Sequence, residues 1–165
     1  MQNSTNSFTP AKYIKTLSLL HMVIMATPVL VGVFFYSQAS DTYLNFTNTE
    51  DIFLAICPIV AVGSIFLGDY LLKKMVNSFP PDLDLKEKLI RFQRACIIKY
   101  GLMEGATFLC VIFFYQTHNL AYLAIGAFLT FFLFLQRPVK DKIERILNLQ
   151  GAQKSQFNRM NQPIV

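Results

Sequence analysis

The chain has 165 residues, of which 53% are apolar, with a mean hydropathy of +0.40 and a formal net charge of +5. This length suits one domain. The composition argues against a soluble helical bundle, because buried helices of such proteins rarely stay apolar on all sides over about twenty residues. A charge of +5 could indicate a nucleic-acid partner, but its distribution along the chain assigns it to a membrane face instead.

Four apolar runs follow one another along the chain, at residues 16–36, 52–72, 95–115 and 120–135. About twenty apolar residues cross a hydrocarbon core of about 30 Å, and three of the runs reach that length. The first run is longer than the apolar region of a secretory signal, so we keep it as a span. We therefore predict an all-α, polytopic membrane protein with four transmembrane helices.

The fifteen Lys and Arg residues alternate with these runs. They lie before the first run, between the second and third or just inside the third, and after the fourth, whereas residues 37–51 and 116–119 carry none. Short basic loops stay in the cytoplasm. Both termini are thus predicted to be cytoplasmic, and the lipid bilayer and the anionic lipid headgroups of that face are the expected partners, with no nucleic acid.

The segments outside the spans have their own signals. We predict a disordered tail over residues 1–12, the bundle over 13–149 and a polar tail over 150–165. Glu50 or Asp51 would start the second helix, and Asp82 or Asp84 would cap an amphipathic extension of the third. Residues 139–149 place apolar side chains among charges, which predicts a short interfacial helix ended by Gly151. Four residues, 116–119, would join the last two spans in a tight hairpin.

Glu104 lies about midway along the third apolar run. A carboxylate at that depth costs at least about 2.5 kcal/mol on insertion scales and is a functional candidate by default. It could be a site for proton or cation movement, or a structural group that holds helices together by hydrogen bonds. Gly101 and Gly105 flank it at GxxxG spacing, which lets another helix approach closely. That helix could supply a hydrogen-bond partner for Glu104.

Three further polar residues, His21, Asp69 and Lys99, are expected at similar depths near the inner face. An Asp69–Lys99 ion pair with His21 nearby is sterically feasible. Alternatively, Asp69 pairs with Lys73 one turn away on its own helix, or Lys99 extends its ammonium to the headgroup layer.

The sequence shows no motif typical of a catalytic, metal-binding or cofactor-binding site. Cys57, Cys96 and Cys110 match no metal or CxxC spacing and are interpreted as small packing residues. His21 and His118 would lie toward opposite membrane faces and could not share one metal. We therefore expect no enzyme activity, no cofactor and no metal.

Leu102-Met103-Glu104-Gly105 and the exit at Arg137-Pro138 resemble a poorly characterised family of small bacterial four-span membrane proteins. In these a Leu-x-Glu-Gly/Ala step marks the third span, and the resemblance covers most of residues 13–149. It implies a bacterial cytoplasmic (inner) membrane location but no known activity. The same Glu step is faintly similar to the carboxylate helix of rotary ATPase proteolipids, which are rich in Gly and Ala where this chain is rich in Phe.

Two functions follow as expectations. The first is a non-enzymatic accessory or assembly subunit of a larger membrane complex, or a small self-assembling bundle. The second is a small proton- or cation-translocating protein that uses Glu104.

Overall fold

The computed structural model describes residues 8–48 and 50–164 and forms six helices within them. Their bounds are α1 Pro10–Gln38, α2 Ile52–Asn77, α3 Leu85–Thr117, α4 Leu120–Leu135, α5 Lys140–Ile146 and α6 Gly151–Asn158. The predicted all-α class is confirmed over these residues. Three helices, α1, α2 and α3, are long and apolar enough to cross a membrane, and α4 reaches that standard only together with α5, from which it is bent by 83°. Three to four such helices indicate a membrane protein.

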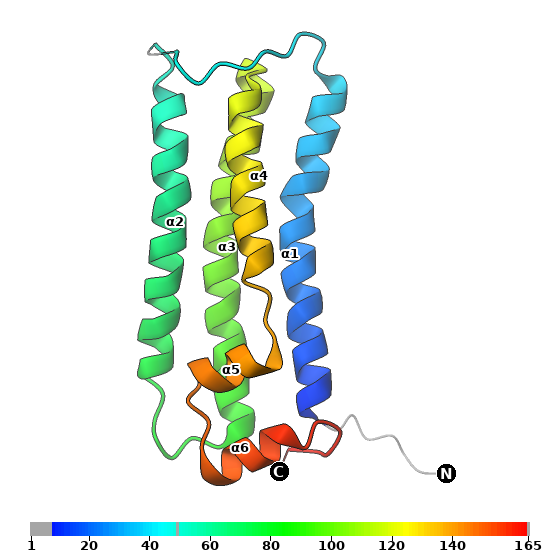
Figure 1. Cartoon of the computed structure of the whole chain (residues 1–165), viewed down its shortest axis with the longest axis vertical. Helices are drawn as coiled ribbons and strands as arrows, with labels where there is room; N and C mark the ends of the chain where they lie inside the picture. The colour runs from blue at the N-terminus through cyan, green and yellow to red at the C-terminus, as the bar shows by residue number, and fades with distance from the viewer. Residues whose placement is uncertain (1–7, 49, 165) are drawn as a thin grey trace, which may run out of the picture.

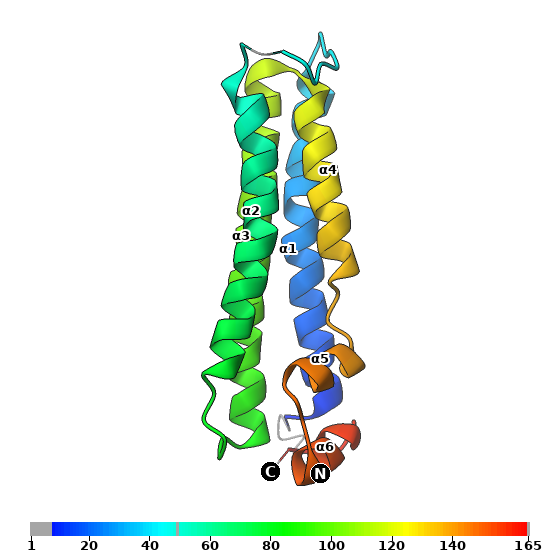
Figure 2. The ribbon, with the colours of Figure 1, turned by 60° about the vertical axis from the view of Figure 1, so that its left-hand side comes forward.

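The helix α3 is the centre of the bundle. It packs against α1, α2 and α4, and α1 and α2 stand on opposite sides of the α3–α4 pair (Figure 1). The two ends of the described chain, α5 and α6 share one end of the molecule, which we call the basal end. The described part of the connection between α1 and α2 lies at the opposite end, which we call the loop end (Figures 1 and 2). A backbone hydrogen bond of 2.9 Å from Ile164 N–H to the Phe8 carbonyl ties the two ends of the described chain together.

Side-chain caps set where the long helices begin. Thr9, Asp51, Asp84 and Asn119 each accept a hydrogen bond from a backbone N–H two or three residues further on, which satisfies an otherwise unpaired donor of the first turn. Asp51 and Asp84 are each one of the two residues that the sequence offered for the starts of these helices. His118 ends α3 in the left-handed conformation, with φ of 58°, so that α3 and α4 form the predicted tight hairpin.

Asn119 holds the loop end together. Its side-chain amide donates to the Asn45 carbonyl at 2.8 Å, and its oxygen accepts from Asn45 N–H at 3.0 Å and from Ala121 N–H at 3.1 Å. Tyr43 N–H donates to the His118 carbonyl at 3.2 Å, and the Tyr43 carbonyl accepts from Leu120 N–H at 2.7 Å. The long connection between α1 and α2 is therefore fastened to the α3–α4 hairpin.

The basal end differs from the sequence expectation. Gly151 does not end the interfacial helix: α5 stops at Ile146, and Gly151, with φ of 53°, begins α6. The expected polar tail over 150–165 thus contains a helix, because Phe157 on α6 is completely buried against the basal core. The expected N-terminal tail lies outside the described residues up to residue 7, and from Pro10 onward the chain is already helical.

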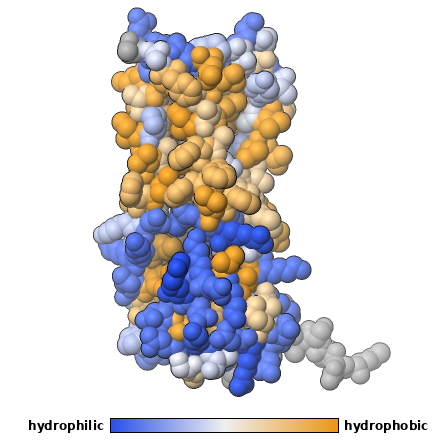
Figure 3. Space-filling model, viewed as in Figure 1, coloured by the Kyte–Doolittle hydropathy of each residue, from blue (hydrophilic) through white to orange (hydrophobic). Residues whose placement is uncertain are grey.

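Two kinds of interior are present along the bundle. Around the basal end, large side chains from α1, α3, α5 and α6 form one continuous buried cluster, which includes Leu17, Leu89, Phe92, Ile143 and Phe157. Toward the loop end the buried clusters are smaller. The surface also changes along the bundle: hydrophilic residues cover the basal part, and apolar residues cover the part above it, which we call the belt (Figure 3).

Candidate functional site

Glu104 lies on α3 about 20 Å from its Thr117 end, as thirteen residues at 1.5 Å each. Its side chain is half-buried and makes no hydrogen bond or ion pair with any residue that the structure describes. Its neighbour Met103 is fully buried, so Glu104 does not lie on the side of α3 that faces the core. The carboxyl group is therefore left to face the surroundings of the helix.

Gly101 and Gly105 lie on the exposed side of α3. A Cβ added to either glycine would meet no atom within 4 Å, so among the described residues no helix uses the predicted GxxxG groove. Exposed isoleucines continue this side in both directions. We call the surface formed by Ile97, Ile98, Gly101, Gly105 and Ile112, with Glu104 at its edge, the outer face of α3.

The groove that packs helices within this chain lies on α2 instead. Its buried residues toward the loop end are all small: Cys57, Ala61, Ser64 and Gly68. Spacings of four, three and four residues put them on one side of the helix. At Gly68 α2 lies close to α3, since a Cβ there would be 3.1 Å from Lys99 Cγ and 3.4 Å from the Lys99 carbonyl oxygen. This small-residue stripe, which the sequence reading missed, is typical of membrane helix pairs.

Lys99 and Asp69 form an ion pair across the same contact. Lys99 is only 6% exposed, whereas the Asp69 side chain remains 43% exposed, so the pair sits at the edge of the α2–α3 interface. The alternative in which Asp69 pairs with Lys73 is not the arrangement found. The ion pair neutralises an ammonium that packing has removed from solvent.

His21 belongs to a different contact. Its Nε2 lies 2.9 Å from the Leu133 carbonyl oxygen, and its ring meets Tyr100 edge-on with 4.7 Å between centroids. One turn earlier, Ser18 donates to the Pro138 carbonyl at 3.2 Å. The predicted three-residue cluster therefore divides: Asp69–Lys99 joins α2 to α3, and His21 joins α1 to the end of α4.

A small cavity of about 20 Å³ lies at the basal side of Lys99, with Tyr100, Gln136 and Lys142 among its lining residues. Burial lowers the pKa of Lys142 below its usual range, and the nearby Lys99 ammonium lowers this pKa further. Gln136 Oε1 is buried without a hydrogen-bond partner among the described residues. A cavity of this size has room for about one water molecule. It is therefore too small for a substrate and is suited to a structural water.

Cys57 and Cys110 meet across the α2–α3 interface nearer the loop end, with their sulfur atoms 3.0 Å apart. Both are free and buried, as is Cys96, which lies in the basal cluster. Near them, the Tyr122 hydroxyl donates to Asp51 Oδ2 at 2.7 Å and links α4 to the start of α2. Linear spacing could not indicate this thiol contact, because 53 residues separate the two cysteines.

Comparisons with protein-family models, with curated proteins and with solved structures give no match. The family resemblance inferred from the Glu104 step and the Arg137-Pro138 exit therefore stays a prediction. The site has to be interpreted from its own geometry, in which the outer face of α3 is the open feature.

Proposed function

We propose that the protein is a non-enzymatic membrane subunit that assembles, through the outer face of α3, with a transmembrane helix of a second copy or of a partner protein. The observation that carries this proposal is the unpaired carboxyl of Glu104 beside two glycines that no described residue covers. In lipid, an apolar side chain gains little from leaving hydrocarbon, so small residues and interhelical hydrogen bonds determine where helices associate. The outer face of α3 offers both.

The use of the other polar groups supports the same proposal. The ammonium of Lys99, the ring of His21 and the hydroxyl of Ser18 all make contacts between elements of the bundle. These three groups therefore serve packing between elements, whereas the Glu104 carboxyl makes no such contact among the described residues. A donor from another helix would give its carboxyl the same role between subunits.

Replacing both Gly101 and Gly105 with leucine tests the proposal. The new side chains meet no atom within 4 Å of their Cβ positions, so the monomer should fold normally, while a second helix can no longer approach closely. We expect the assembled fraction, measured by cross-linking in membranes and by light scattering in mild detergent, to fall at least tenfold. Glu104→Gln, which keeps hydrogen-bonding groups, should reduce it less than Glu104→Leu.

The matched control is Gly63→Leu on α2, because a Cβ at Gly63 also meets nothing within 4 Å but lies on another helix. This variant should assemble like the wild type. A wild-type protein that stays monomeric in membranes and retains no partner in mild detergent would refute the proposal.

A second candidate function, proton or cation translocation, depends on the same unpaired Glu104. It predicts that purified protein in proteoliposomes dissipates a pH or cation gradient and that Glu104→Gln reduces the flux at least tenfold. Flux that is equal in the two proteins, or equal to that of empty liposomes, would eliminate this candidate.

The proposed setting is the bacterial cytoplasmic membrane, with both termini in the cytoplasm. The fifteen basic residues support this orientation, because none of them lies in residues 37–51 or 116–119, the two connections opposite the basal end. A membrane-impermeant thiol reagent should label the variant Lys86→Cys only after the membrane has been permeabilised, because the reagent then reaches the cytoplasmic face. Labelling of that position in intact cells would show that the protein has the opposite orientation.

A further inference from the structure

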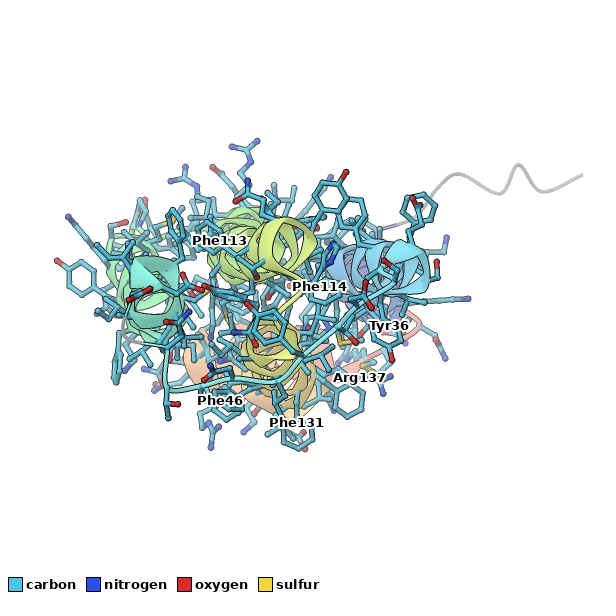
Figure 4. All side chains as sticks on the ribbon, turned by 90° about the horizontal axis from the view of Figure 1, so that it is seen from above. Tyr36, Phe46, Phe113, Phe114, Phe131 and Arg137 are labelled. Atoms are coloured by element: carbon cyan, nitrogen blue, oxygen red, sulfur yellow. The ribbon has the colours of Figure 1, made fainter. Side chains whose placement is uncertain are left out.

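A large groove lies between α1 and α4, on the loop-end side of His21, with α3 as its floor. Its volume is about 480 Å³, within the range of ligand pockets in proteins. The buried glycines Gly32 on α1 and Gly126 on α4 lie among its lining residues. Figure 4 looks along the bundle and shows Tyr36 of α1 and Phe131 of α4, both lining residues, on the same side of the molecule.

The interior of the groove is apolar. Among the described residues that line it, Tyr36, Thr107 and Thr130 carry a side-chain hydroxyl. Both threonine hydroxyls donate at 2.9 Å to carbonyls of their own helices, those of Met103 and Gly126. These threonines have therefore already used their donors. An occupant of the groove gains from apolar contact and finds little to hydrogen-bond, which excludes sugars and peptide backbone as good ligands.

The shape of the groove is elongated along the bundle. Its lining runs on α4 from Leu123 to Phe134 and on α1 from Met25 to Tyr36. Each stretch has twelve residues, so its ends are eleven steps of 1.5 Å apart, or about 16 Å. Both helices are candidate spans or part of one, so the long direction of the groove follows theirs. An extended acyl chain in a bilayer has the same direction.

A cation marks the basal end of the groove. Arg137 follows the lining residue Phe134 by one turn, and its N–H donates to the Phe134 carbonyl at 3.2 Å. In the view along the bundle, Arg137 lies between Tyr36 and Phe131 (Figure 4). Its guanidinium is exposed and pairs with no carboxylate of the described chain. Guanidinium groups at a membrane surface attract anionic headgroups and bind phosphate with several parallel hydrogen bonds.

We propose that this groove binds one acyl chain of an anionic phospholipid from the leaflet at the basal end, with the lipid phosphate at Arg137. The apolar groove selects the chain, and the guanidinium selects the charge of the headgroup. This groove is separate from the outer face of α3, so the proposal of lipid binding can be tested independently of the proposed assembly.

The test uses the fact that the chain contains no tryptophan. Phe131→Trp places a single reporter on the groove wall, and Phe128→Trp places one outside the groove on the same helix; the two phenylalanines are 60% and 59% exposed. Each variant is reconstituted in phosphatidylcholine vesicles with a minor fraction of phosphatidylglycerol brominated on its acyl chains. Bromine quenches tryptophan on contact, and we expect at least twofold stronger quenching at position 131 than at position 128.

Two further pairs of variants, each a test and its control, identify the cause of the excess quenching. Arg137→Gln should remove the excess quenching at position 131, whereas Arg145→Gln, which lowers the net charge equally, should leave it. Ala127→Phe fills the groove and should also remove the excess, whereas Ala124→Phe, outside the groove on the same helix, should not. Equal quenching at the two reporters overturns the proposal. So does an excess that survives Arg137→Gln or that appears equally with brominated phosphatidylcholine.

Discussion

The basal part of the bundle and the apolar belt above it are packed differently, although α1, α2 and α3 run through both. In the basal part, large side chains such as Leu89, Phe92 and Phe157 are removed from the surface. In the belt, α2 points large side chains such as Phe66 and Ile59 outward and turns small residues such as Ala61 and Gly68 toward the neighbouring helices. The large buried side chains of the belt, such as Phe114 and Tyr122, come from α3 and α4.

The two solvents explain the difference. Water outside the membrane makes burial of apolar surface favourable by about 25 cal/mol per Å², so the basal part forms a core of large side chains. Hydrocarbon gives no such gain, and association there depends on close contact and on hydrogen bonds. The level at which α4 ends, where the surface changes from apolar to hydrophilic in Figure 3, is therefore where one packing principle replaces the other.

The largest expected effect separates the two regions directly. Phe92→Ala removes a ring that is only 2% exposed in the basal core and should lower the free energy of unfolding by about 3–5 kcal/mol. Phe66→Ala removes a ring that is 72% exposed in the belt and should change it by less than about 0.5 kcal/mol. Denaturant titration in micelles, followed by circular dichroism, measures both. Similar losses for the two variants would contradict the comparison.

An intermediate effect is expected for the small-residue stripe of the belt. Gly68→Leu puts a side chain against Lys99 Cγ, 3.1 Å from the Cβ position, and should lower the free energy of unfolding by about 1–3 kcal/mol through overpacking. Gly63→Leu, at an open position of the same helix, should be neutral or slightly stabilising. If Gly68→Leu is tolerated as well as Gly63→Leu, close helix contact does not hold α2 to α3.

The smallest effect concerns the ion pair at the boundary between the regions. Asp69→Asn leaves the ammonium of Lys99 buried without a charged partner, and because Asp69 is partly exposed the expected loss is only about 1 kcal/mol. Glu87→Gln breaks the 2.5 Å pair with Arg91, which is exposed on both sides, and should cost less than about 0.5 kcal/mol. The same titrations test this order, and the reverse order would show that burial of Lys99 needs no compensation.

The sequence predicted the elements of the fold better than their contacts. The caps at Asp51 and Asp84 and the tight hairpin at residues 116–119 follow from local signals, and the structure has them. The helix α6 was missed because its composition is polar. Phe157 and Ile164, apolar residues within that polar segment that prove to be buried, were the signal that could have revealed it.

The candidate site shows the same limit. Asp69 and Lys99 could be matched by depth, because 1.5 Å per residue places them at one level. Depth does not give direction around the axis, so His21 was grouped with them although it faces Tyr100 and Leu133. The groove between α1 and α4 was not foreseen at all, since its lining residues resemble any others in an apolar span.

The sequence by itself determined the four long helices, the candidate starts of α2 and α3 and the gathering of cationic residues at one end, because these depend on local backbone chemistry and on the cost of moving charge across lipid. The tertiary structure alone decided which side of each span is covered. Lipid and protein are almost equally apolar, so a span carries little periodic signal of which side meets a neighbour. That is why the GxxxG spacing of α3 did not say which helix would approach it, and the structure leaves these glycines open beside Glu104.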